Sequence, residues 1–152
     1  MNIRPDGSLD MSDDDLAGRD WVVASLHSSF DKSPTERILA AMENPHVDCI
    51  GHPTGRKINK RPPADVDVER LIEAALATNT ALEINSQPDR LDMTDAHARA
   101  AAEAGVRVPI NSDGHGVETL PYVEIGSAQA RRAWMTKEQV LNTRPWSRIR
   151  PK

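Results

Sequence analysis

Four short apolar segments alternate with stretches of helical periodicity, and this alternation restricts the fold more than any other feature of the sequence. The segments span Trp21–Leu26, Val47–Ile50, Ala81–Asn85 and Val106–Asn111. Each is rich in β-branched or small apolar residues and is bounded by polar or turn-forming residues, which is typical of buried strands. Their starts recur about every 25–35 residues, the size of a βα unit. We therefore expect an α/β fold in which parallel strands are covered by helices.

Helix start and stop signals lie between these segments. A capping box with proline at the first helical position opens the first expected helix, an apolar stripe marks the second, a terminal glycine ends the third, and another capping box opens the last. The expected helices run from the Ser33–Glu36 capping box to about Met42, over Asp67–Thr78, over Thr94–Ala104 before Gly105, and over Val123–Arg132, with a last short helix opening at Thr136–Gln139.

The length of 152 residues predicts one domain over residues 1–152. A chain of this size buries roughly 68–70% of its unfolded surface, so a hydrophobic core can form. No run approaches the roughly 20 apolar residues of a membrane helix, so we expect no membrane partner. Cys49 is the only cysteine, which excludes an intramolecular disulfide and is compatible with a cytoplasmic location.

The formal net charge of −4 does not favour a general nucleic-acid grip, which needs clustered Lys and Arg. Two local stretches are basic, at residues 56–61 and 144–152. Either the first is a solvated loop and the second a frayed terminus, or they bind phosphate locally. The first lies within a long expected loop, Gly55–Val66, and loops of this length often contact substrate.

Three histidines and an aspartate follow the expected strands. His27 comes after the first strand, His52 after the second, and Asp113 and His115 after the fourth. Parallel α/β folds place their sites at the carboxyl ends of strands, and imidazole and carboxylate are the usual donors for Zn, Mn or Fe. We therefore expect these four residues to be metal ligands in a hydrolytic site. His46 and His97 lie elsewhere, where surface or packing roles are expected.

Polar residues also end the third expected strand. Glu83 and Asn85 are two residues apart, so on a strand they point the same way. They either hydrogen-bond to the ligands or bind metal directly. Arg90 follows in the next loop, where its planar fork either meets a phosphate or forms an ion pair with an aspartate. The candidates for that ion pair are Asp89, Asp92 and Asp95.

Together these motifs resemble a known family. The stretches Asp20–His27, Asp48–Pro53, Leu82–Asn85 and Ile110–His115 resemble the later motifs of the PHP (polymerase and histidinol phosphatase) superfamily. Within that superfamily, the amino-acid sequence at residues 51–56, 86–91 and 140–143 is similar to that of the C-terminal PHP domain of bacterial family X DNA polymerases. The resemblance covers nearly the whole chain and rests on the motifs in combination.

The resemblance implies a distorted seven-stranded β/α barrel that holds up to three Mn, Zn or Fe ions. It implies that His27 and His52 share one metal ion, Asp113 binds a second and His115 a third, with Asp113 and His115 in the catalytic centre. The implied chemistry is phosphoester hydrolysis by a metal-activated hydroxide. In polymerase-linked members this means 3′-end processing of DNA, including 3′–5′ exonuclease activity, with Arg56, Lys57 and Arg90 as candidate phosphate contacts.

The chain departs from the family pattern at its start. The family site opens with a His-x-His motif, a further His and a bridging Glu, none of which precedes residues 1–10 here. We therefore expect an incomplete domain, the C-terminal part of the barrel without its N-terminal strands. Three alternatives stay open: an enzyme completed by a missing N-terminal half, a non-catalytic binding module, and a minimal hydrolase working as a homo-oligomer. A small-molecule phosphatase of the histidinol-phosphatase type is the alternative to a DNA substrate.

Overall fold

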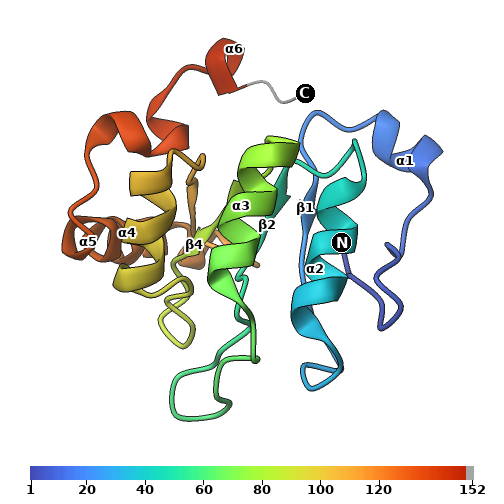
Figure 1. Ribbon diagram of the computed structural model, residues 1–152. Coiled ribbons are helices and arrows are strands. Elements are labelled where there is room, and N and C mark those ends of the chain that lie inside the picture. Colours follow the sequence, from blue (N-terminus) through green and yellow to red (C-terminus); the bar gives the residue numbers. More distant parts are fainter. Residues whose placement is uncertain (150–152) are drawn as a thin grey trace.

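Short parallel strands form the centre of the computed structural model, which describes residues 1–149 (Figure 1). They are β1 (Val23–Ala24), β2 (Cys49–Ile50), β3 (Ala81–Leu82), β4 (Ile84–Asn85) and β5 (Ile110–Asn111). β1 pairs with β2, β2 with β3, and β4 with β5, all in parallel. The predicted order of strand segments is confirmed, although regular pairing covers only part of each one.

The third predicted strand divides its pairing between two neighbours. The backbone N–H of Glu83 donates to the carbonyl of Ile50 at 3.0 Å, on the β2 side. The N–H of Ile84 donates to the carbonyl of Pro109 at 2.9 Å, on the β5 side. Residues 81–85 therefore connect the three-stranded sheet β1-β2-β3 to the two-stranded sheet β4-β5.

The N-terminal segment lies beside β1. Asn2 bridges Ser25 in parallel, and the Ile3 N–H donates to the Ser25 carbonyl at 2.9 Å. The buried guanidinium of Arg37 donates to the carbonyls of Ile3 and Ser29, both at 2.7 Å. Charge-assisted hydrogen bonds to buried carbonyls are strong, so Arg37 fixes the N-terminal segment to the helix α2 (Pro34–Glu43), in which Arg37 lies.

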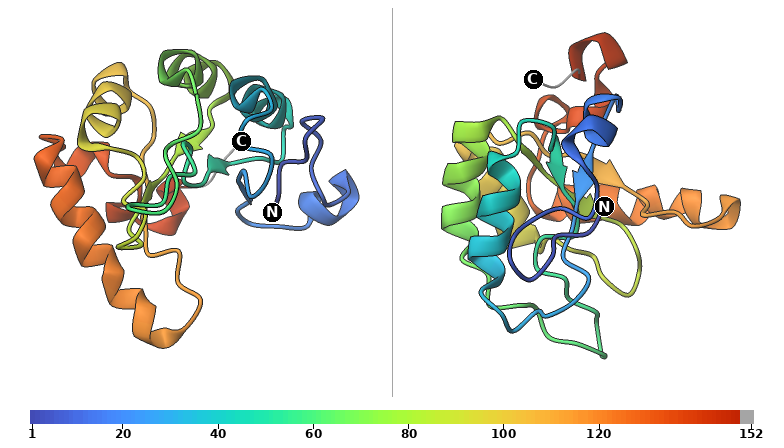
Figure 2. Two further views of the ribbon diagram at one scale, coloured as in Figure 1. Left: turned by 90° about the horizontal axis from the view of Figure 1, so that it is seen from below. Right: turned by 90° about the vertical axis from the view of Figure 1, so that its right-hand side faces the viewer.

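Helices cover one face of the strands. Figures 1 and 2 show α2, α3 and α4 in a row over that face, with α5 beyond α4 and α1 at the opposite end. The α-helices are α1 (Asp13–Ala17), α2 (Pro34–Glu43), α3 (Val68–Thr78), α4 (Asp95–Ala104), α5 (Val123–Arg132) and α6 (Trp146–Ile149). Three short 3₁₀ helices are η1 (Val117–Tyr122), η2 (Lys137–Gln139) and η3 (Leu141–Thr143).

The helix ends follow the sequence signals in most places. Asp67 accepts from the Arg70 N–H and begins α3, and Thr94 accepts from the His97 N–H and begins α4. Gly105 ends α4 with a φ of 93°. The predicted capping box at Ser33 is wrong in its hydrogen bonding, because the Ser33 backbone is left-handed and its side chain makes no capping bond.

Burial of aliphatic side chains between strands and helices holds these layers together. The largest fully buried side chains of this hydrophobic core include Ile3, Leu26, Ile38, Met42, Ile50, Leu71, Leu82, Ile84, Met93 and Val108. The parallel strands and covering helices confirm the α/β class. Within residues 1–149 the strands do not close into a barrel, so the full PHP barrel stays an expectation. Across the same residues, every helix is too short or too polar to cross a bilayer.

Candidate functional site

Two imidazole rings meet where β1 and β2 end, on the side of the molecule viewed in the left panel of Figure 2. His27 follows Leu26 at the end of the first strand segment, and His52 follows Gly51 after β2. Their ring centroids are 5.2 Å apart, with the ring planes at 89°. Because β1 and β2 are neighbouring parallel strands, their carboxyl ends bring together two histidines that are 25 residues apart in sequence.

The loop around His52 is tightly built. His52 is buried and has a φ of 33°, a left-handed conformation that costs energy for a non-glycine residue. A Cβ added to the preceding Gly51 would lie 2.6 Å from the Ser25 hydroxyl, so only glycine fits there. The Nδ1 atom of His52 is buried and has no hydrogen-bond partner within residues 1–149. A buried imidazole nitrogen without a partner calls for an explanation, and a bound ligand would provide one.

Glu83 organises the residues below this loop. One of its carboxylate oxygens accepts from the His52 backbone N–H at 2.8 Å and from Asn85 Nδ2 at 3.1 Å. The other accepts from Asn111 Nδ2 at 2.8 Å. Burial raises the pKa of Glu83, and these three donors act in the opposite direction. Sequence reasoning missed Asn111, although it closes β5 directly opposite Asn85 in the β4–β5 register.

Asp113 joins this network from the other side. Its Oδ2 accepts from Asn85 Nδ2 at 3.0 Å and lies 3.6 Å from Arg90 Nε. Its carbonyl accepts from Gln87 Nε2 at 2.7 Å, and its φ of 50° is also left-handed. Asn85 thus bridges the carboxylates of Glu83 and Asp113, and both His52 and Asp113 are held in strained backbone conformations.

His115 lies at the outer edge of the group. Its side chain is 83% exposed, and its Nδ1 lies 2.8 Å from the carbonyl of Asp113. A carbonyl can only accept, so Nδ1 carries the proton in this contact. In the neutral ring the lone pair is then on Nε2, which is left free for a ligand.

The two arginines predicted as phosphate contacts have different surroundings. Arg56 donates to the carbonyls of Arg90 (from Nε, 2.7 Å) and Leu91, so it braces the 86–93 loop. Arg90 approaches Asp113, which is not among the three aspartates considered from the sequence; Asp89 instead pairs with Lys57 at 3.6 Å. The Nη1 atom of Arg90 is buried without a partner within residues 1–149, and so retains a free donor.

Asp92 is a further buried carboxylate that the sequence analysis did not select for the site. It accepts from the Thr54 backbone N–H at 3.0 Å, two residues after His52. Burial raises its pKa to about 6. The local sequence does not show that Asp92 is buried while Asp89 and Asp95 are not, because burial depends on how the loop packs.

The donors fit part of the coordination of a divalent metal ion. Burial is the main reason why the pKa of His27 is lowered and the pKa of His52 is lowered to about 4. Both rings are therefore neutral at pH 7, and their lone pairs can bind metal. Within residues 1–149, no three His, Cys, Asp or Glu side chains converge on one point. The arrangement therefore offers a two-imidazole site beside a separate group of Asp113, Arg90 and His115.

Comparison with known proteins gives the relationship of the chain. No family model matches it. It is 46% identical over 147 residues to the DNA polymerase/3′-5′ exonuclease PolX of Bacillus subtilis (strain 168), a match that covers 95% of this chain and 26% of that protein. It is 34% identical over 150 residues to a probable phosphatase of Caldanaerobacter subterraneus, covering 91% of this chain and 57% of that protein. A probable phosphatase of Thermoanaerobacter sp. (strain X514) is 31% identical, with 91% and 59% covered.

The chain spans about a quarter of the polymerase and less than three fifths of these two probable phosphatases. The matches extend over more than nine tenths of the chain and include all the strand ends described above. The chain is thus a homologue of part of a bacterial family X DNA polymerase and of probable phosphatases, which is consistent with the PHP domain that its motifs resemble.

Proposed function

We propose that the chain carries part of the active site of a metal-dependent phosphoesterase, and that its substrate is the 3′ end of DNA. The observation that carries this proposal is the His27–His52 pair, with a 5.2 Å ring separation and a buried His52 Nδ1 that has no hydrogen-bond partner within residues 1–149. The relationship to a protein named as a polymerase and 3′-5′ exonuclease supports the choice of DNA.

Each residue has a distinct part in this proposal. His27 and His52 would hold one ion, here Mn, Zn or Fe, and Asp113 and His115 would hold the others of a set of up to three. Such an ion, when bound, polarises the phosphoryl group and lowers the pKa of a coordinated water. Remaining coordination positions would be filled by water, substrate oxygens or donors outside residues 1–149, including those of a second protein segment or a second copy.

Arg90 would contact the phosphate directly. Its Nη1 has no hydrogen-bond partner within residues 1–149, and its guanidinium already lies beside Asp113. A planar guanidinium matches two phosphate oxygens. Arg56 would help to position Arg90 for this phosphate contact, because it donates a hydrogen bond to the Arg90 carbonyl. Glu83 and Asn85 would fix His52 and Asp113 through the hydrogen bonds given above.

The test is hydrolysis by the purified chain in Mn²⁺, with bis(p-nitrophenyl) phosphate and with 3′-labelled single-stranded DNA. We expect release of 3′ nucleotides that disappears in His52→Ala and in chelator. His46→Ala is the matched control, because His46 precedes the same strand that His52 follows. Equal rates in His52→Ala and the unmodified chain would refute the assignment. Hydrolysis of bis(p-nitrophenyl) phosphate without release of 3′ nucleotides would refute the DNA substrate and retain the phosphoesterase.

A further inference from the structure

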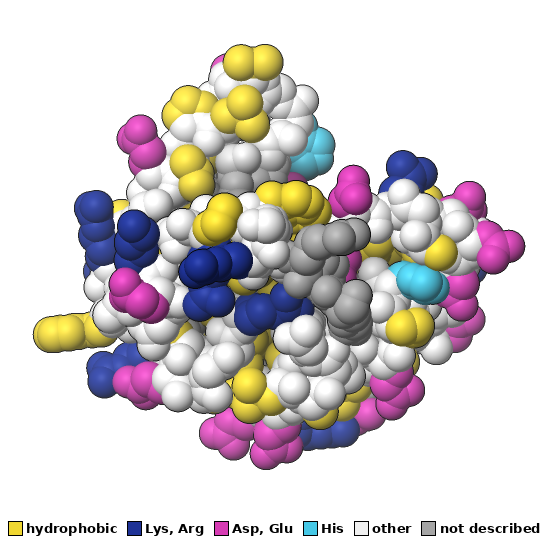
Figure 3. All heavy atoms as spheres, turned by 90° about the horizontal axis from the view of Figure 1, so that it is seen from above, with side chains coloured by type: hydrophobic (Ala, Val, Ile, Leu, Met, Phe, Trp, Pro, Cys, Tyr) yellow, Lys and Arg dark blue, Asp and Glu magenta, His cyan; other side chains and the backbone are white. Residues whose placement is uncertain are grey.

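Charge is distributed very unevenly along the chain. Residues 131–152 contain seven Lys or Arg and one acidic residue, for a net charge of +6, whereas residues 1–130 have a net charge of −10. Figure 3 shows the consequence on one face, where Lys and Arg side chains gather on the left and centre with a few acidic side chains among them, and further acidic side chains occupy the right and lower edges. A basic surface on an acidic protein is an electrostatic footprint for a polyanion.

The basic residues line two neighbouring hollows. Two hollows of about 370 and 380 Å³ share Lys137 and Thr143 in their walls. Arg131 lines the first, and Arg144 and Arg148 line the second. None of these four cations forms an ion pair within residues 1–149, and Glu138 is the one acidic side chain that lines the two hollows.

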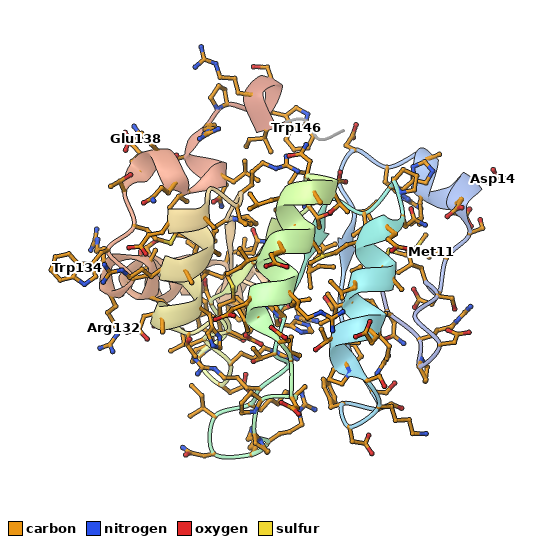
Figure 4. All side chains as sticks on the ribbon, in the orientation of Figure 1. Met11, Asp14, Arg132, Trp134, Glu138 and Trp146 are labelled. Carbon is orange, nitrogen blue, oxygen red and sulfur yellow. The ribbon has the colours of Figure 1, made fainter. Side chains whose placement is uncertain are left out.

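An exposed tryptophan, Trp134, directly precedes Met135, which lines the first hollow. Trp134 is 80% exposed and follows α5 with a φ of 60°. Helices commonly end with glycine in that conformation, and a bulky residue there is strained. Figure 4 shows the indole projecting away from the end of α5, near Arg132. A large apolar ring kept in solvent by a strained backbone suggests a binding role.

We propose that this surface, made of Arg131, Trp134, Lys137, Arg144 and Arg148, binds single-stranded nucleic acid. A base would stack on the Trp134 indole while the phosphates follow the four cations, which is the arrangement that binds single strands without sequence preference. In Figure 1 the η2, η3 and α6 segments lie at the upper end of the molecule, whereas the strands end below. The surface is therefore separate from the His27–His52 site, and the inference does not rest on the proposed function.

The test is fluorescence anisotropy of a labelled oligothymidine titrated with the chain in EDTA, so that metal-dependent contacts do not contribute. Trp134→Gly removes the stacking ring and also suits the left-handed backbone, so its melting temperature should not fall. We expect its affinity to fall about fivefold to a hundredfold, the range measured for losing one stacked base. Lys137→Glu should also bind more weakly and should reduce the salt dependence of binding.

Arg19→Glu is the control for overall charge, since Arg19 is an exposed residue just after α1, far from α5 in Figure 1. It should bind like the unmodified chain. The proposal is overturned if the unmodified chain does not bind, if Trp134→Gly binds normally, or if Arg19→Glu weakens binding as much as Lys137→Glu. Sedimentation that shows a dimer lost in Lys137→Glu, without oligothymidine binding, would assign the surface to a second copy instead.

Discussion

The carboxylate of Glu83 accepts a hydrogen bond from the backbone N–H of His52 at 2.8 Å, and both residues are buried. This contact joins the third strand segment to the loop after β2 and fixes the candidate ligand from below. Because Asn85 and Asn111 donate to the same carboxylate, Glu83 is the point where three strand ends meet.

Replacing Glu83 tests that network. Glu83→Ala leaves three buried donors without an acceptor, and we expect a loss of about 3 kcal/mol in the free energy of unfolding. Glu83→Gln keeps one acceptor oxygen and the shape, so its loss should be less than half as large. Urea denaturation measures both. A Glu83→Ala variant as stable as the unmodified chain would show that the network does not exist in solution.

Asp92 predicts a specific pH dependence of stability. Its folded-state pKa of about 6 lies above the usual 3.8, so protonation favours the folded state. This contribution is complete below pH of about 4 and is lost as the pH rises through about 6, with a total of up to about 3 kcal/mol. Asp92→Asn should lack it, because the amide stays neutral and its oxygen can still accept from Thr54.

The measurement for Asp92 is the difference in unfolding free energy between Asp92→Asn and the unmodified chain, from pH 4 to 7.5. Taking the difference removes the opposite contribution of His27 and His52, whose lowered pKa values favour folding as the pH rises. We expect the variant to gain relative stability with pH. A difference that is flat across this range would mean that Asp92 is not buried as described.

Gly55 gives a steric prediction next to the basic loop. Its φ is 62°, and a Cβ there would lie 2.4 Å from a ring carbon of Phe30. Gly55→Ala should therefore lower the free energy of unfolding by about 3 kcal/mol. Adding Phe30→Leu should recover part of the loss by relieving the contact. If the double variant is less stable by the full sum of the two single losses, the clash is not the cause.

Sequence periodicity predicted the layers of this fold, because apolar spacing and caps are local. The α3, α4 and α5 bounds agree with the expected helices within a residue. α1 was missed because its five residues include three aspartates and one buried leucine, which is too short for a periodic signal. The shared pairing of residues 81–85 was also missed, since strand partners depend on long-range packing.

The candidate site was predicted in part for the same reason. Strand ends identified His27 and His52 as candidates, and parallel neighbours place them together. The positions of Arg56 and Arg90 could not be read from residue type, because loop folding decides that Arg56 holds carbonyls and that Arg90 meets Asp113. The role of Asp92 depends on its complete burial. The sequence does not show which of Asp89, Asp92 and Asp95 is buried, because all three have the same side chain.

The central claim is that His27 and His52 are donors to one metal ion. Isothermal titration of Mn²⁺ into the unmodified chain, His27→Ala, His52→Ala and the His46→Ala control tests it directly. We predict that the unmodified chain and the control bind alike, and that each of the other two variants binds at least about tenfold more weakly. No binding by the unmodified chain, or equal binding by His52→Ala, would contradict the claim.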